Sequence, residues 1–176
     1  MSRHRKISEE EVQGWFAGRL PEGWFTGAPE VSVDREEILV VGTLPDPEVA
    51  KGSAPEVVAS AREARIDGFR EDTREQRMRI AEEAQQRFGR RVSWGASSGD
   101  VRKLFTTVSM PVMTRLRMPE RAVLDTLVDA GVARSRSHAL AWCVRLVGEN
   151  QTEWIENLRD ALVAVEKARS EGPTPA

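Results

Sequence analysis

A proline separates two different periodicities in the stretch MTRLRMPERAVLDTLVDAG, which runs from Met113 to Gly131. Before Pro119 the apolar and polar side chains alternate, which is the period of a β-strand. After it the apolar residues recur every three or four positions, which is the period of a helix. Proline is favoured at the first helical position because its missing N–H has no partner to lose there. The pattern therefore predicts a strand that passes into a helix without a connecting loop.

A second helix is predicted directly after the first. Gly131 is suited to the left-handed conformation that ends a helix, and Ser135 is placed to cap the helix SRSHALAWCVRLV. One strand and two short helices cannot bury their apolar faces alone, so we expect a second copy of the chain. The two strands would pair antiparallel, and two pairs of helices would close the core beneath them. The residues predicted to form this dimer core are Leu116, Met118, Leu124, Leu127, Leu140 and Val144.

The segment Val112–Glu149 resembles the ribbon-helix-helix superfamily of DNA-binding proteins, of the Arc, MetJ and CopG type. The shared pattern is an alternating strand, then LRMPE, an apolar helix, a glycine and SRSHAL. The resemblance implies that Met113, Arg115 and Arg117 contact bases in the major groove, where arginine can donate two hydrogen bonds to guanine. It also implies phosphate contacts at the start of the second helix, where backbone N–H groups and the helix dipole attract anions. The residues at that position are Ser135, Arg136, Ser137 and His138.

Charge is distributed unevenly along a chain whose formal net charge is only -2. Residues 1–50 carry five Lys or Arg against ten Asp or Glu, whereas residues 87–147 carry eleven against four. Such asymmetry is typical of a binding region inside a protein that is neutral as a whole. We therefore expect double-stranded DNA to bind the basic region, and a protein partner is possible through the acidic N-terminal region.

The N-terminal third predicts a helix followed by a β-hairpin. In ISEEEVQGWFAGRL, Ser8 and Glu11 have the spacing of a capping box. The hairpin is predicted over residues 30–34 and 38–43. We interpret the acidic cluster between its strands as a solvated turn rather than a metal site, because no other ligand type converges on it.

A proline-rich linker leads to a long charged helix, predicted over residues 55–87. Its narrow apolar stripe is typical of a partly exposed arm or a coiled-coil seam. The Gly and Ser residues between positions 95 and 99 predict a turn, and Asp100 predicts the cap of a short helix that ends at Phe105. The run GASSGD lacks the lysine of a phosphate-binding loop, so we do not interpret it as a nucleotide site.

The predicted fold class is mainly α with minor β. Residues 1–50 are expected to form the acidic helix and hairpin, and residues 51–110 the linker, the long helix and the turn. The ribbon-helix-helix module is assigned to residues 111–150, a C-terminal helix to 151–171 and a disordered tail to 172–176. The C-terminal helix is expected to fold back over Trp142, which would place Trp142 and Trp154 in the core.

Several classes of function have no support in the sequence. Cys143 is the only cysteine, so no intrachain disulfide is possible, and the two histidines are too far apart in sequence to indicate a metal site. We expect no catalytic residues, no cofactor and no enzymatic activity. No apolar run reaches the roughly 18 residues of a membrane span, and the N-terminus lacks the apolar segment of a signal peptide. These features predict a soluble cytoplasmic protein without a membrane partner.

The function hypothesis that follows is a homodimeric DNA-binding protein, either a transcriptional repressor or a plasmid-maintenance-type regulator. The alternative is a protein-interaction or antitoxin-like module, in which the ribbon-helix-helix serves mainly dimerisation. Independently of that choice, Arg115 and Arg117 have the simpler interpretation of a solvated strand face, and His138 that of an exposed neutral histidine, which the sequence favours over a phosphate contact.

Overall fold

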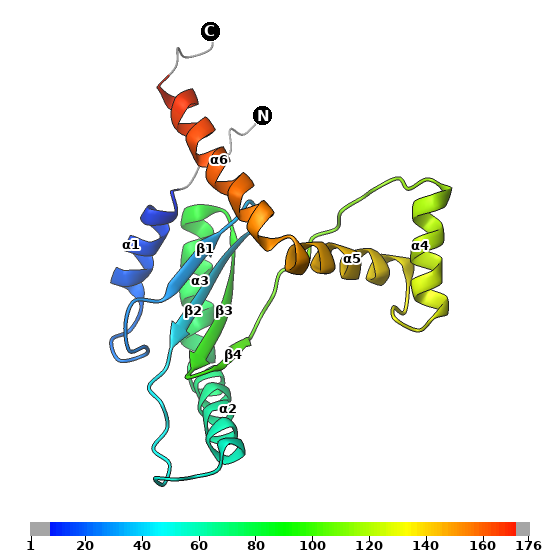
Figure 1. The fold of residues 1–176 in the computed structure, drawn as a ribbon. Coiled ribbons are helices and arrows are strands. Elements are labelled where there is room, and N and C mark those ends of the chain that lie inside the picture. Colours follow the sequence, from blue (N-terminus) through cyan, green and yellow to red (C-terminus); the bar gives the residue numbers. More distant parts are fainter. Residues whose placement is uncertain (1–7, 172–176) are drawn as a thin grey trace. The chain divides into compact units, whose positions relative to one another are not determined.

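The computed structural model describes residues 8–171, and the chain divides into two compact units at position 111. The described residues form a mixed α/β chain with six helices and one four-stranded sheet (Figure 1). The sheet and three helices belong to the N-terminal unit, and the other three helices belong to the C-terminal unit. The minor β content predicted from sequence is therefore too small, because two further strands extend the predicted hairpin into a sheet.

The sheet has the strand order β1 (Glu30–Val33), β2 (Glu37–Thr43), β3 (Arg91–Ser98) and β4 (Val101–Leu104). Strands β1 and β2 pair antiparallel, which confirms the predicted hairpin. Asp34 forms its turn, since its Oδ1 accepts hydrogen bonds from the backbone N–H groups of the two glutamates that follow, at 2.8 and 2.6 Å. Strands β2 and β3 pair in parallel, so the chain between them must cross over, and it does so through helices.

The prediction of a turn at residues 95–99 and a helix ending at Phe105 is wrong, because this region is the hairpin of β3 and β4. Gly95 lies within β3, where an added Cβ would stand 2.9 Å from the carbonyl oxygen of Lys103 on the neighbouring strand. The two serines Ser93 and Ser98 are buried in the same strand. Close packing of the strands thus accounts for the small residues within β3, and the turn itself is confined to Gly99 and Asp100.

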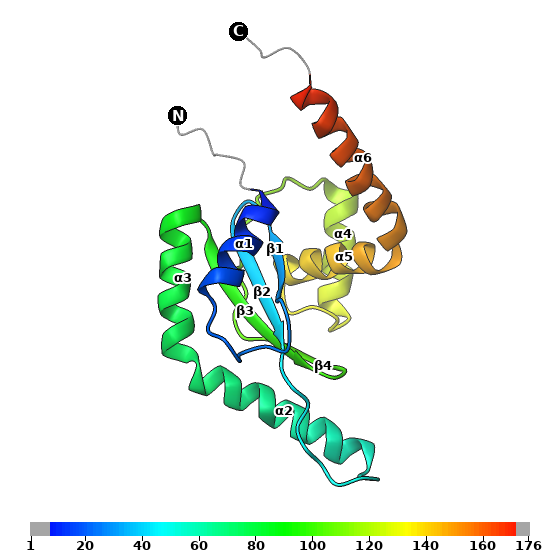
Figure 2. The ribbon, with the colours of Figure 1, turned by 90° about the vertical axis from the view of Figure 1, so that its left-hand side faces the viewer.

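The long helix predicted over residues 55–87 is two helices, α2 (Pro55–Asp72) and α3 (Arg74–Phe88), which meet in the bend that Figure 2 shows. The break falls at Thr73, whose hydroxyl donates to the carbonyl of Phe69 at 2.5 Å. The narrow apolar stripe is confirmed, but it belongs neither to a free arm nor to a coiled-coil seam, since Ile66 of α2 and Ile80 of α3 are fully buried in the core against the sheet.

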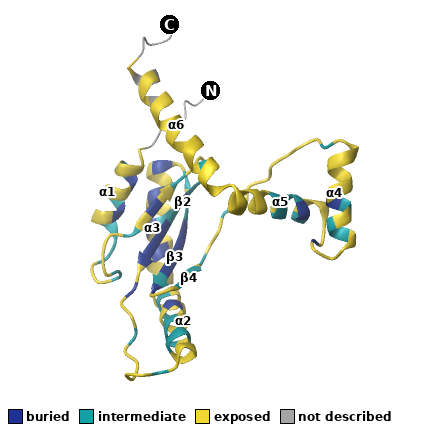
Figure 3. Cartoon of the chain, viewed as in Figure 1, coloured by how far each residue is buried: buried dark blue, intermediate teal, exposed yellow. Residues whose placement is uncertain are grey.

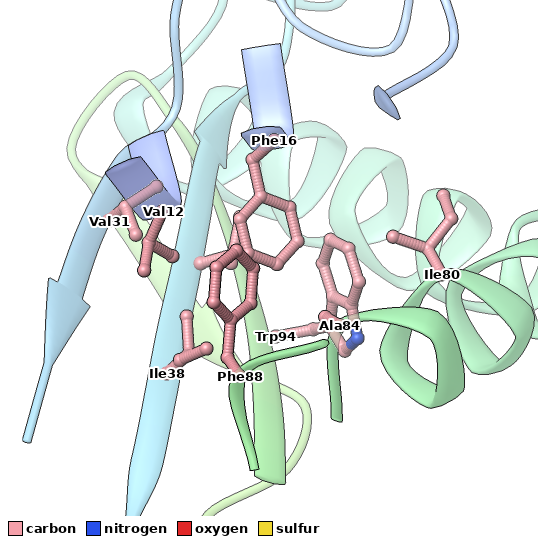
Figure 4. Close-up of a cluster of buried hydrophobic side chains, with 9 residues drawn as sticks. Val12, Phe16, Val31, Ile38, Ile80, Ala84, Phe88 and Trp94 are labelled. Carbon is pink, nitrogen blue, oxygen red and sulfur yellow. The ribbon is translucent and has the colours of Figure 1, made fainter. Parts of the chain in front are cut away.

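The main core lies between one face of the sheet and helices α1 (Glu9–Arg19) and α3 (Figures 3 and 4). The N-terminal helix is confirmed, although the Ser8 side chain makes no capping hydrogen bond. Ring contacts between aromatic residues stabilise this core, as where Phe16 meets Trp94 edge-on at 6.0 Å between ring centroids. The labelled residues of the cluster are Val12, Phe16, Val31, Ile38, Ile80, Ala84, Phe88 and Trp94.

Gly99 provides a direct test of the β3–β4 hairpin. Its φ is +55°, and an added Cβ would collide with the Arg62 guanidinium, which holds Asp46 and Asp100 at 2.9 and 2.7 Å. We expect Gly99→Ala to lower the free energy of unfolding by ~1–2 kcal/mol from the left-handed backbone alone. Gly14→Ala is the matched control, because φ is not positive there and nothing lies within 4 Å of the added Cβ. Urea unfolding curves that shift equally for both variants would contradict this account of the turn.

The C-terminal unit contains α4 (Met118–Asp129), α5 (Arg136–Asn150) and α6 (Thr152–Ser170), so all three predicted helices are confirmed. Helix α4 has Pro119 in its first turn, and Gly131 follows it with φ +75°. The predicted strand before α4 is absent from the isolated chain, where residues 106–117 have no regular secondary structure. A strand requires hydrogen bonds to a neighbouring strand, so its formation in a dimer stays a prediction.

Helix α6 does not form the predicted cover over Trp142. Trp154 is 56% exposed, and Leu158 and Leu162 further along the helix are exposed as well (Figure 3). The prediction that Trp154 lies in the core is therefore wrong for the isolated chain, whereas Trp142 is half-buried. The tail of residues 172–176, predicted to be disordered, lies outside the described residues.

Candidate nucleic-acid interface

A small core holds together the first two helices of the C-terminal unit. Leu124 of α4 is 5% exposed and packs with Ala133 and Ala139, which lie in the loop and in α5. Leu116, Leu127 and Leu140 are partly buried against this cluster, so four of the six predicted dimer-core residues come together within one chain.

The other two predicted core residues remain uncovered in the isolated chain. Met118 is 74% exposed and Val144 is 66% exposed. Val112 and Val147 are exposed as well, so the apolar surface of this unit extends beyond the cluster around Leu124. These two predicted core residues therefore have no apolar cover within the described part of the chain.

An open groove of about 710 Å³ lies between the segment 112–116 and the beginnings of helices α4 and α5. Four of the predicted contact residues line it: Met113, Arg115, Arg136 and Ser137. The structure thus brings predicted base-contacting and phosphate-contacting side chains to one site, although the two groups come from separate elements. Arg117, the N-cap of α4, is not among the residues that line the groove.

The two arginines predicted to contact bases are exposed, and neither side chain has a hydrogen bond or ion pair within residues 8–171. Met113 beside them is almost fully exposed. The extended segment that carries them is attached to α4 by Arg121, whose Nη1 donates to the carbonyl of Leu116 at 2.8 Å. This positioning role of Arg121 was not predicted, because a side chain that binds a backbone carbonyl leaves no pattern in the sequence.

Arg136 is already engaged within the chain. Its Nε and Nη2 donate to the two carboxylate oxygens of Asp125 at 2.6 and 2.7 Å. Arg136 thereby lowers the pKa of the Asp125 carboxyl, and the same hydrogen bonds raise the pKa of Arg136. Asp125 lies on α4 and Arg136 on α5, so no helical spacing connects them and the sequence analysis missed the pair. A phosphate that binds Arg136 has to share it with this carboxylate.

The remaining predicted phosphate contacts form the cap of α5. The Ser135 hydroxyl accepts from the backbone N–H of His138 at 3.2 Å, and Ser137 is exposed on the first turn. His138 Nδ1 accepts from the backbone N–H of Arg134 at 3.3 Å. The first N–H groups of a helix have no partner inside the helix, and they attract anions together with the helix dipole.

Two other classes of site, a metal centre and a membrane span, have no support in the described part of the chain. No group of three His, Cys, Asp or Glu side chains there is arranged to hold a metal ion. None of its helices combines the length and apolarity that a membrane crossing demands.

Two family models match the chain, and together they cover both units. Residues 10–104 match the N-terminal domain of Rv1265-like proteins, and residues 117–169 match the Mb1296 C-terminal domain. No solved structure gives a significant match.

Curated relatives are similar over most of the chain. The uncharacterized protein Mb1296 of Mycobacterium bovis is 59% identical over 160 residues, which are 90% of this chain and 69% of the relative. The uncharacterized protein Rv1265 of Mycobacterium tuberculosis matches with the same identity and coverage.

Proposed function

This chain belongs to the Rv1265-like protein family, and we propose that its C-terminal unit makes it a homodimeric DNA-binding protein. In the dimer the segments before α4 pair into a two-stranded ribbon that enters the major groove. Arg115 and Arg117 then read bases from the ribbon, and the first turn of α5 holds a phosphate. In this proposal the chain acts as a transcriptional repressor or a plasmid-maintenance-type regulator. Its proposed localisation is the cytoplasm, where it would meet DNA.

The observation that carries the proposal is the uncovered apolar surface beside an extended segment without strand partners. Met118 and Val144 are mostly exposed, although each has the position of a core residue in a ribbon-helix-helix dimer. A second copy of the chain supplies both a strand partner and an apolar cover. Antiparallel pairing gives the backbone of each segment its hydrogen bonds and brings the partner's side chains over the exposed apolar surface.

Charge supports DNA as the ligand of this dimer. Within the C-terminal unit, residues 112–147 have six Arg against three Asp or Glu, and Arg115 and Arg117 have no carboxylate partner among the described residues. Arginines that are exposed and unpaired are available to phosphate and to guanine. The acidic region of residues 1–50 repels phosphate, and we assign it to a protein partner.

We expect the purified chain to sediment at twice its 19.7 kDa mass and to bind random duplex DNA with a strong dependence on salt. Each phosphate contact contributes about -0.9 to the slope of log K against log salt, because counterions are released. Fluorescence anisotropy with labelled duplexes at several chloride concentrations measures that slope.

The same two measurements separate the proposal from its alternative. A dimer that fails to bind DNA at any salt concentration is a protein-interaction module of the antitoxin-like kind. A folded monomer would contradict both the DNA-binding proposal and the protein-interaction alternative, since the ribbon cannot form without a second strand.

A further inference from the structure

Three arginines gather where α2 bends into α3 in the N-terminal unit. Arg70 is in the last turn of α2, and Arg74 and Arg77 are in the first turns of α3. We call these three residues the elbow arginines. They line a groove of about 770 Å³. The other residues that line it are Asp67, Glu71, Met78, Phe105 and Thr106.

Arg77 is buried, with only 6% of its surface exposed, and hydrogen bonds fix the position of its guanidinium. Its Nε donates to the Thr73 hydroxyl at 3.0 Å, and its Nη2 donates to the carbonyl of Arg70 at 2.6 Å. The guanidinium carbon lies 5.0 Å from the centre of the Phe105 ring. These contacts satisfy hydrogen bonds at the end of α2, but none of them supplies a negative charge. A buried cation without a counter-charge is unfavourable.

The carboxylates of the groove do not neutralise the elbow arginines. Asp67 is bound by Lys103, whose Nζ lies 3.0 Å from its Oδ2. Glu71 is exposed, and no ion pair connects it to an arginine within the described residues. Burial lowers the pKa of the Arg77 guanidinium, and the charges of Arg70 and Arg74 lower it further. Three cations therefore face one groove with a single unpaired carboxylate beside them.

We propose that this groove binds a small organic phosphate, with the phosphate on the elbow arginines. Guanidinium groups match phosphate oxygens in charge and in bidentate geometry. The groove has the size of a small-molecule site and is much larger than a phosphate ion. Its remaining lining includes half-exposed Met78 and the ring of Phe105, which an apolar part of the ligand covers. The proposal concerns the N-terminal unit alone and does not depend on DNA binding by the C-terminal unit.

The experiment is isothermal titration calorimetry on the full chain with phenyl phosphate and inorganic phosphate as probes, at constant ionic strength. We expect both to bind at one site, and phenyl phosphate to bind more tightly because its ring covers Met78 and Phe105. Arg70→Gln and Arg74→Gln are expected to weaken binding about tenfold each, since each removes charge-assisted hydrogen bonds. Both side chains are exposed, and neither makes a hydrogen bond or an ion pair within the described residues.

Arg79→Gln is the matched control, because Arg79 is an exposed arginine of α3 that does not line the groove. The proposal is overturned if neither probe binds the wild-type chain, or if Arg79→Gln weakens binding as much as the elbow variants. It is also overturned if the elbow variants leave phenyl phosphate binding unchanged while they weaken binding to random DNA, since the arginines then contact a nucleic-acid backbone. Loss of DNA binding in variants of the C-terminal unit has no bearing on these outcomes.

Discussion

Replacing Val144 with aspartate is expected to convert the proposed dimer into monomers. Val144 is 66% exposed in the isolated chain, where such a substitution is nearly neutral. In the proposed dimer the side chain is buried, and losing that burial costs about 1.5 kcal/mol or more for each valine. A dimer contains two copies, so its dissociation constant rises about a hundredfold, and the unpaired charge adds to the loss.

Sedimentation velocity across a range of concentrations measures this effect. Val57→Asp is the matched control, because Val57 is a half-exposed valine of α2 in the N-terminal unit. Its mass distribution should equal that of the wild type, and circular dichroism should show that both variants keep their helices. If Val144→Asp remains a dimer at the lowest concentration, the association surface proposed for the C-terminal unit is wrong.

The double substitution of Arg115 and Arg117 by alanine is expected to abolish sequence preference. Each bidentate contact between arginine and guanine contributes roughly 1–3 kcal/mol of discrimination, and the dimer repeats both residues. The decrease in affinity should be much larger on a preferred duplex, selected from a random library, than on random DNA. Anisotropy titrations of both duplexes at one salt concentration measure the difference.

Arg136 is expected to behave differently, because it lies at the start of α5 and its partner is Asp125. Arg136→Ala should weaken binding to all duplexes alike and reduce the salt slope by roughly one unit for each phosphate that the arginine no longer neutralises. Asp125→Asn is the informative counterpart, since it releases Arg136 and should strengthen binding to random DNA. Equal decreases in affinity on both duplexes for all three arginines would leave a nonspecific DNA binder, and the repressor proposal would have to be abandoned.

Local patterns in the sequence predicted the helices of the C-terminal unit correctly. Pro119, Gly131 and Ser135 act on residues within a few positions of themselves, so their effect on the backbone does not depend on the rest of the fold. The β-hairpin of β1 and β2 was predictable for the same reason, because alternation and a turn residue such as Asp34 are local signals.

The sequence alone therefore determined the β1–β2 hairpin and the ends of the C-terminal helices, and only the tertiary structure decided features that depend on contacts between distant residues. Gly95 lies in a strand because the backbone of β4 passes close to it, and the break at Thr73 follows from packing of both helices on one sheet. Asp125 was missed because its partner Arg136 is on another helix. Each of these features depends on contacts between residues far apart in the chain, and such contacts leave no periodic signal.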